Sequence, residues 1–134
     1  DLPYIISDVL DSESSTKTVA IKSYVLTHSK GLQPSTTVAV EIEGELLEEN
    51  ASGDGQYDAF LNAIRKMYKK KKRQLPQLVD YAVHIPPGSH SDALCETSIT
   101  WLLDGKEFIT RGLDSDQTVS AIKATEKMLN SIAL

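Results

Sequence analysis

The first half of the chain contains three segments in which apolar and polar side chains alternate. A period of two places successive side chains on opposite faces of a β-strand. In the second segment Val38, Val40 and Ile42 share one face, and Glu43-Gly44 has the composition of a hairpin turn. The pattern therefore predicts three consecutive strands, over residues 18–28, 36–42 and 46–51.

The apolar positions change to helical spacing after a glycine-rich turn, Ser52-Gly53-Asp54-Gly55, and predict a helix from about Gln56 to Lys71. Two interpretations of the turn are open. It is a strand-to-helix turn with Gly53 or Gly55 at positive φ, or it is an anion site, because the first N–H groups of a helix lack intrahelical acceptors.

The same order of elements recurs in the second half of the chain. Asp104-Gly105 is a favoured two-residue hairpin turn. The acidic turn Asp114-Ser115-Asp116 follows, and an Asp or Ser at such a position can cap a helix. The predicted elements are strands over residues 78–85, 93–103 and 107–112 and a helix over residues 116–132.

A single offset relates the two halves. Adding 61 to the residue number pairs Val38 with Ile99, Gly44 with Gly105, Gln56 with Gln117 and Met67 with Met128. The common offset across a hairpin and a helix indicates an internal duplication. One strand-strand-strand-helix unit cannot cover both faces of its sheet, so we expect an α+β domain of two pseudo-symmetric units.

The predicted boundaries follow from this repeat. The repeat predicts a domain over residues 16–134, with units over about 16–73 and 75–134. We expect residues 1–15 to be the end of a linker that precedes this domain, and the apolar run 2–10, with Pro3 near its start, predicts one or two helical turns.

Length and composition fit one globular domain. The 134 residues are 40% hydrophobic and 25% charged, and the net charge of −5 gives no general support to a nucleic-acid partner. The single Cys95 excludes an intramolecular disulfide and favours a reducing compartment. The sequence shows neither a transmembrane run nor a signal peptide. Because it starts at Asp1 without Met, we expect a fragment or a processed chain.

The sequence contains no constellation typical of catalysis or metal binding. His28, His84 and His90 are scattered, and Cys95 lies in a predicted strand, where cysteine acts as a small hydrophobe. The basic run Lys69–Arg73 falls at a predicted helix C-terminus, where cations are favourable, and indicates a solvated helix end. A ligand-binding or interaction module is therefore favoured over an enzyme.

The glycine turn is the most specific ligand feature of the sequence. Its N–H groups can hold a carboxylate, and Asp58 can hold an amine. Leu78, Tyr81 and Ile85 lie on a predicted strand and can form an apolar wall. Amide donors, one carboxylate and an apolar pocket suit an apolar amino acid in its zwitterionic form.

At these residues the chain resembles a known family. SGDGQYDAFLNAI is similar to the G-x-G-P-x-D-A motif of the C-terminal regulatory domain of 2-isopropylmalate synthases and citramalate synthases. LVDYAVHI, SDALCETSITWLLDGKEFITRG and SDQTVSAIKATEKMLNSI resemble the rest of that domain in order and spacing, and DLPYIISDVL resembles the end of the preceding linker. The resemblance covers nearly the whole chain.

The resemblance implies a cytoplasmic allosteric domain that forms a homodimer and binds leucine or isoleucine as feedback inhibitor. The catalytic barrel that it would regulate uses acetyl-CoA and a divalent metal, and it is not in this chain. The domain itself would need no cofactor and no metal, and would contact neither nucleic acid nor membrane. The alternative is a dimerisation module without a functional effector site.

The resemblance also implies the effector contacts. They are the turn Gly53, Asp54 and Gly55, the helix start Tyr57 and Asp58, the apolar lining Leu78, Tyr81, Ile85 and Cys95, and, in the second unit, Ser115 and Gln117. The chain departs from the family pattern at Gln56, where the family often has proline. Proline pre-sets a helix start, so this turn is expected to be looser, with one more N–H group to donate.

Overall fold

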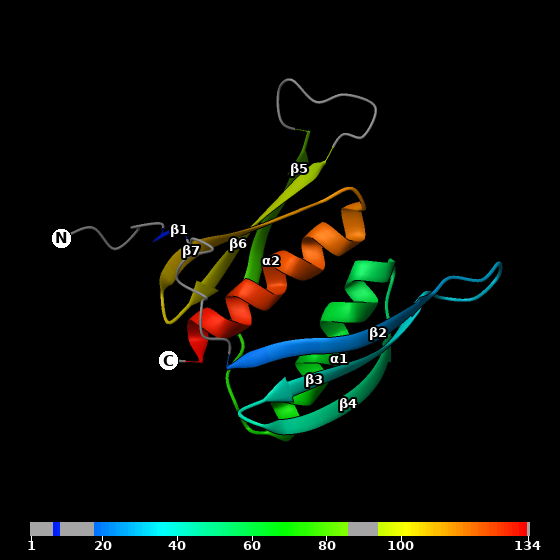
Figure 1. The fold of residues 1–134 in the computed structure, drawn as a ribbon, viewed down its shortest axis with the longest axis horizontal. Helices are drawn as coiled ribbons and strands as arrows, with labels where there is room; N and C mark the ends of the chain where they lie inside the picture. The colour runs from blue at the N-terminus through cyan, green and yellow to red at the C-terminus, as the bar shows by residue number, and fades with distance from the viewer. Residues whose placement is uncertain (1–6, 9–17, 86–93, 134) are drawn as a thin grey trace. The chain divides into compact units, whose positions relative to one another are not determined.

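The computed structural model describes residues 7–8, 18–85 and 94–133. The chain divides into two compact units, which we describe separately. The first unit comprises Lys17–Leu75, and the second unit comprises Pro76–Leu134 together with Asp1–Thr16. In the described residues each unit has an antiparallel three-strand core followed by a helix, as the sequence predicted (Figure 1).

The first unit contains an antiparallel sheet of order β2-β3-β4 and one helix. Its elements are β2 (Val19–Thr27), β3 (Ser35–Ile42), β4 (Glu45–Ser52) and α1 (Gln56–Lys70). The predicted hairpin turn is confirmed: Glu43 has φ 51° and Gly44 has φ 84° between the paired residues Ile42 and Glu45. Positive φ at both central positions matches the twist of the two strands.

Helix α1 packs on β3 and β4 through an apolar face that includes Phe60, Ile64 and Met67. The predicted face of β3 is confirmed, because Val38, Val40 and Ile42 are buried. The basic run at the end of α1 pairs with acids of the same unit. Its ion pairs are Lys70–Glu49 at 2.7 Å, Lys71–Glu45 at 2.6 Å and Arg73–Glu43 at 2.5 Å.

The second unit repeats this arrangement and adds a strand. Its elements are β5 (Gln77–His84), β6 (Cys95–Leu103), β7 (Lys106–Asp114), α2 (Gln117–Ile132) and β1 (Ser7–Asp8). The sheet order is β1-β7-β6-β5, and helix α2 packs over β6 and β7. The hairpin turn has φ 53° at Asp104 and φ 78° at Gly105.

The expectation of helical turns over residues 2–10 is wrong for the two residues that the structure describes there. Ser7 and Asp8 form β1, which runs parallel to β7 with Ser7 opposite Phe108. An edge strand such as β7 presents unpaired N–H and C=O groups, which an extended segment satisfies better than a short helix does. The rest of the predicted helical segment lies outside the described residues.

The offset of 61 holds at the level of elements. It carries β3 onto β6, β4 onto β7 and α1 onto α2, each within one residue at either end. The first strands follow a different offset, which their β-bulges reveal. Ile21 pairs with Val40 just before the bulge in β2, and Leu78 pairs with Trp101 just before the bulge in β5. Strand β5 is therefore equivalent to β2 at an offset of 57. The connection between the first two strands has ten residues in the second unit and seven in the first.

No helix among the described residues is long and apolar enough to cross a membrane.

Candidate functional site

The glycine turn joins the end of β4 to the start of α1 in the first unit. Gly53 N donates to Pro34 O at 3.1 Å, which fixes the turn against the start of β3. A Cβ atom on Gly53 would lie 2.6 Å from Ala59 N and 2.8 Å from the Asp58 carbonyl carbon. Gly53 is therefore required by the close approach of the turn to the first turn of α1.

The interpretation with positive φ at Gly53 or Gly55 is wrong. Among the described residues, the glycines with positive φ are Gly31, Gly44 and Gly105. Gly55 has φ −136° and ψ 174°, an extended conformation that any residue can adopt. The physical reason for glycine here is the space between β4 and α1, and that constraint acts at Gly53.

Helix α1 starts without a side-chain cap. Gly55 occupies the N-cap position and has no side chain to accept a hydrogen bond from the first turn. The first turn contains Asp58, whose exposed carboxylate Oδ2 lies 3.6 Å from the position of a Cβ on Gly55. Donors at the helix start and one acceptor beside the turn thus lie together at one edge of the first unit. Asp54, within the turn, is exposed.

Aromatic rings border the helix start. Tyr57 stacks on Phe60 with ring centroids 6.1 Å apart, and Tyr24 of β2 meets the same Phe60 ring edge-on at 6.4 Å. Tyr24 is not among the site residues predicted from the sequence. It occupies the position equivalent to Tyr81, opposite Val38 as Tyr81 is opposite Ile99. The second offset of 57 is the signal that would have found it.

The predicted apolar lining lies in the second unit. The bulge between Leu78 and Asp80 turns Leu78 to the same face of β5 as Tyr81, although a regular strand would place them on opposite faces. It is the side of the sheet on which α2 packs over β6 and β7, since Leu78 and Tyr81 lie opposite the fully buried Trp101 and Ile99.

Leu78 and Tyr81 themselves are only partly buried. Cys95 starts β6 on the same face as Ile99 and is also partly buried. Ile85 follows the end of β5 and is 60% exposed. The glycine turn and this lining therefore belong to different units, and the structure brings together the members of each set within its own unit.

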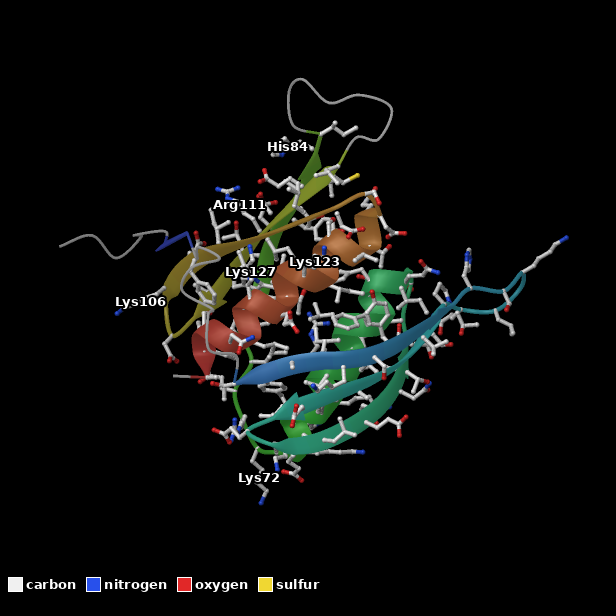
Figure 2. All side chains as sticks on the ribbon, viewed as in Figure 1. Lys72, His84, Lys106, Arg111, Lys123 and Lys127 are labelled. Carbon is white, nitrogen blue, oxygen red and sulfur yellow. The ribbon has the colours of Figure 1, made fainter. Side chains whose placement is uncertain are left out.

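The turn before α2, which contains Ser115, carries its own acceptors. Asp116 Oδ1 accepts from Val119 N at 3.0 Å and caps the helix, while Asp114 Oδ2 accepts from Asp116 N at 2.8 Å. Lys123 of α2, labelled in Figure 2, donates through Nζ to Asp114 Oδ1 at 3.0 Å. The hydrogen bond from the Asp116 N–H group, together with Lys123, holds the pKa of Asp114 below its usual range.

The two helix starts are therefore chemically different at equivalent positions. The offset of 61 places Gly53 on Asp114 and Gly55 on Asp116. The start of α2 holds two carboxylates of its own, so it offers little to a second anion. Ser115 and Gln117 are exposed beside these carboxylates and remain predicted contacts.

A surface groove that the sequence analysis missed lies along the edge of β4 and the outer side of α1. Its volume is about 460 Å³, and its lining is Asn50, Ala51, Ser52, Asn62, Arg65, Lys66 and Lys69. Asn62 Nδ2 donates to Ser52 O at 3.0 Å, and Lys66 Nζ donates to Asn50 O at 2.6 Å. These side chains cover the free edge of β4, so we interpret the groove as part of the protection of that edge against pairing with another strand. None of the predicted effector residues lines it.

The described residues contain no group of three or more His, Cys, Asp or Glu side chains close enough to hold a metal ion. His28 is exposed, and His84 Nε2 lies 3.1 Å from Glu96 Oε1 on the paired strand. His90 lies outside the described residues.

Comparison with known proteins gives one family and several relatives. A family described as the LeuA allosteric (dimerisation) domain matches residues 1–133. The chain is 34% identical over 98 residues to a 2-isopropylmalate synthase of Aquifex aeolicus, covering 72% of the chain and 18% of that protein. It is 26% identical over 133 residues to a 2-isopropylmalate synthase of Methanocaldococcus jannaschii, covering 98% of the chain and 25% of that protein.

A further relative, from Archaeoglobus fulgidus, is named as a candidate (R)-citramalate synthase. The chain is 29% identical to it over 132 residues, which cover 98% of the chain and 26% of that protein. The chain thus spans about a quarter or less of the length of each of these three relatives.

Proposed function

Because the chain belongs to the LeuA allosteric (dimerisation) domain family, we propose that it binds leucine or isoleucine as a feedback inhibitor. The bound amino acid lowers the activity of a 2-isopropylmalate synthase or citramalate synthase barrel that lies outside these 134 residues. Acetyl-CoA and a divalent metal act in that barrel, and the present chain alone carries out no condensation.

One observation carries the proposal: the difference between the two helix starts. Helix α1 begins without a side-chain cap at a turn that has room for no side chain at Gly53, whereas α2 is capped by Asp116. A helix N-terminus without a cap favours a carboxylate. Asp58 in the same first turn supplies an acceptor for an ammonium group. The two ends of a zwitterion thus match two groups of the same turn.

The family resemblance also implies an apolar lining at Leu78, Tyr81 and Ile85, which belong to the second unit. These residues present partly exposed apolar surface on and just beyond β5. Leucine and isoleucine differ only in where a methyl group branches, and an apolar pocket separates such a pair by about 1–3 kcal/mol. Both amino acids therefore remain open as the effector.

Calorimetric titration of the chain with leucine, isoleucine and valine tests the proposal. We expect saturable binding of leucine or isoleucine, and weaker binding of valine because it lacks one methylene group. If the folded chain binds none of the three at millimolar concentrations, the proposal fails. The alternative, a dimerisation module without an effector site, would then stand.

A further inference from the structure

Thr36 carries a buried hydroxyl group. Its side chain is 1% exposed, and among the described residues no hydrogen bond is formed by its Oγ1 atom. Thr36 lies on the same face of β3 as Val38, under helix α1. A buried hydroxyl without a partner destabilises a fold, and a valine of the same shape would avoid that cost. Its presence therefore requires a reason.

The second unit shows the same threonine with a partner. Thr97 is equivalent to Thr36 at the offset of 61, and its Oγ1 lies 2.5 Å from Ser120 Oγ. Ser120 Oγ donates to Gln117 O at 2.7 Å, so Thr97 is the donor in the pair. The residue equivalent to Ser120 is Ala59, which offers a methyl group. The pairing that satisfies Thr97 is therefore absent around Thr36.

The unpartnered hydroxyl lies at the glycine turn. On the neighbouring strand Thr36 pairs with Ala51, the penultimate residue of β4. The glycine turn begins at the end of that strand. Ala59, which faces Thr36 by the equivalence, is also the residue whose N–H group a Cβ on Gly53 would touch. The hydroxyl and the uncapped start of α1 thus occupy the same corner of the first unit.

We propose that Thr36 Oγ1 is a hydrogen-bond donor to the carboxylate of the bound effector. This inference rests on the proposed function and adds a residue to the site. The effector carboxylate would be the acceptor for the Thr36 hydroxyl, as Ser120 Oγ is for Thr97 in the second unit, and would lie beside the Ala59 methyl group. In the first unit the Thr36 hydroxyl has no partner without ligand, because the ligand carboxylate supplies its acceptor. In the second unit Ser120 pairs with Thr97 and Asp116 caps the start of α2, so both groups are satisfied within the protein.

The test is the variant Thr36→Val, in which stability and affinity should move in opposite directions. Removing an unpaired buried hydroxyl should raise the thermal midpoint of the ligand-free chain. Removing a donor to a carboxylate should weaken binding of leucine or isoleucine by about ten- to a hundredfold. Thr97→Val is the matched control: it breaks an existing hydrogen bond, so it should lower the thermal midpoint and leave effector affinity unchanged.

A second variant, Ala59→Ser, gives Thr36 the partner that Thr97 has. It should raise the thermal midpoint and weaken effector binding, because the hydroxyl becomes engaged inside the protein. Parent-like affinity in both Thr36→Val and Ala59→Ser would overturn this inference and leave the proposed function intact. Failure of the parent chain itself to bind leucine or isoleucine would overturn the proposed function first.

Discussion

At the scale of single residues, the candidate site depends on what is missing at two positions. Gly53 has no side chain because the backbone of α1 occupies that space, and Gly55 has none at a position where α2 has a capping aspartate. The first absence is a packing requirement, and the second leaves donors for a ligand. The two glycines of one turn thus have different roles, which substitution can separate.

Gly53→Ala should destabilise the chain more than Gly55→Ala, whose only expected cost is that of alanine at an N-cap position. The added methyl at position 53 would meet backbone atoms at 2.6 Å and 2.8 Å, whereas at position 55 the nearest contact is 3.6 Å to a side-chain oxygen. Overpacking against backbone costs about 1–3 kcal/mol of unfolding free energy. Urea unfolding measures the difference, and equal stability of the two variants would contradict the packing role of Gly53.

Asp58→Asn should weaken effector binding with little change in fold. Loss of a charge-assisted contact to an ammonium group costs about 1.5–3 kcal/mol, or roughly ten- to a hundredfold in affinity. Stability should fall by at most about 1 kcal/mol, the effect of an acid in the first turn of a helix. The control is Glu48→Gln, an exposed acid on β4 outside the predicted site. Equal affinities of the two variants would place the ammonium site elsewhere.

At the scale of elements, alternation and turn chemistry predicted the strands, hairpins and helices to within one or two residues over most of the described chain. The two hairpins could be predicted because each turn has a glycine, Gly44 or Gly105, at its second central position, where positive φ is required. The β-bulges were not readable, since a bulge inserts one residue without a sequence signature. Strand β1 was missed because an edge strand depends on a tertiary partner, here β7.

The predicted site likewise has features that local sequence indicates and features that depend on tertiary contacts. Residue types and spacing indicated the turn and the early acid of α1, and the structure locates both at one corner of the first unit. The shared face of Leu78 and Tyr81 was not derivable from regular alternation, because it depends on the bulge. The unpaired hydroxyl of Thr36 depends on the residue across the strand–helix contact, so periodicity along one element could not reveal it.

The acidic turn before α2 should make stability depend on pH. The pKa of Asp114 is lowered from 3.8 by its hydrogen bond from Asp116 N and by Lys123. As the pH falls, Asp114 is protonated in the unfolded chain before it is protonated in the folded chain. Its contribution to the free energy of unfolding is therefore present above about pH 3.8 and is lost as the pH falls through the lower pKa of the folded state.

Asp114→Asn should therefore be less stable than the parent at pH 7, and this difference should shrink at pH 3 and below. Urea unfolding at several pH values measures it, with the exposed Glu48→Gln as control. A stability difference between parent and Asp114→Asn that is the same at pH 7 and pH 2 would contradict the ionic origin of the effect.

At the scale of the whole molecule, each unit leaves part of its sheet incompletely covered. The helix of each unit packs mainly over the second and third strands. Apolar residues on the covered face of the first strand, Ile21 and Tyr24 in one unit and Leu78 and Tyr81 in the other, stay partly exposed. Exposed large apolar side chains elsewhere, such as Val25 and Leu46, add to this surface. Surface of this kind favours association.

We therefore expect the chain to form a homodimer, in keeping with the dimerisation role in the family description. Sedimentation velocity at micromolar concentration should give twice the mass of one chain, with and without leucine. A single monomeric species under both conditions would contradict the prediction.

The central claim is that a branched-chain amino acid binds at the uncapped start of α1. Amide chemical-shift mapping of the ¹⁵N-labelled chain during titration with leucine or isoleucine tests it most directly. We predict that the largest saturable shifts fall on the backbone amides from Gly53 to Asp58, with no comparable shifts along the outer groove at Arg65 and Lys69. Saturable shifts centred on the groove, or no shifts at the turn while ligand binds, would contradict it.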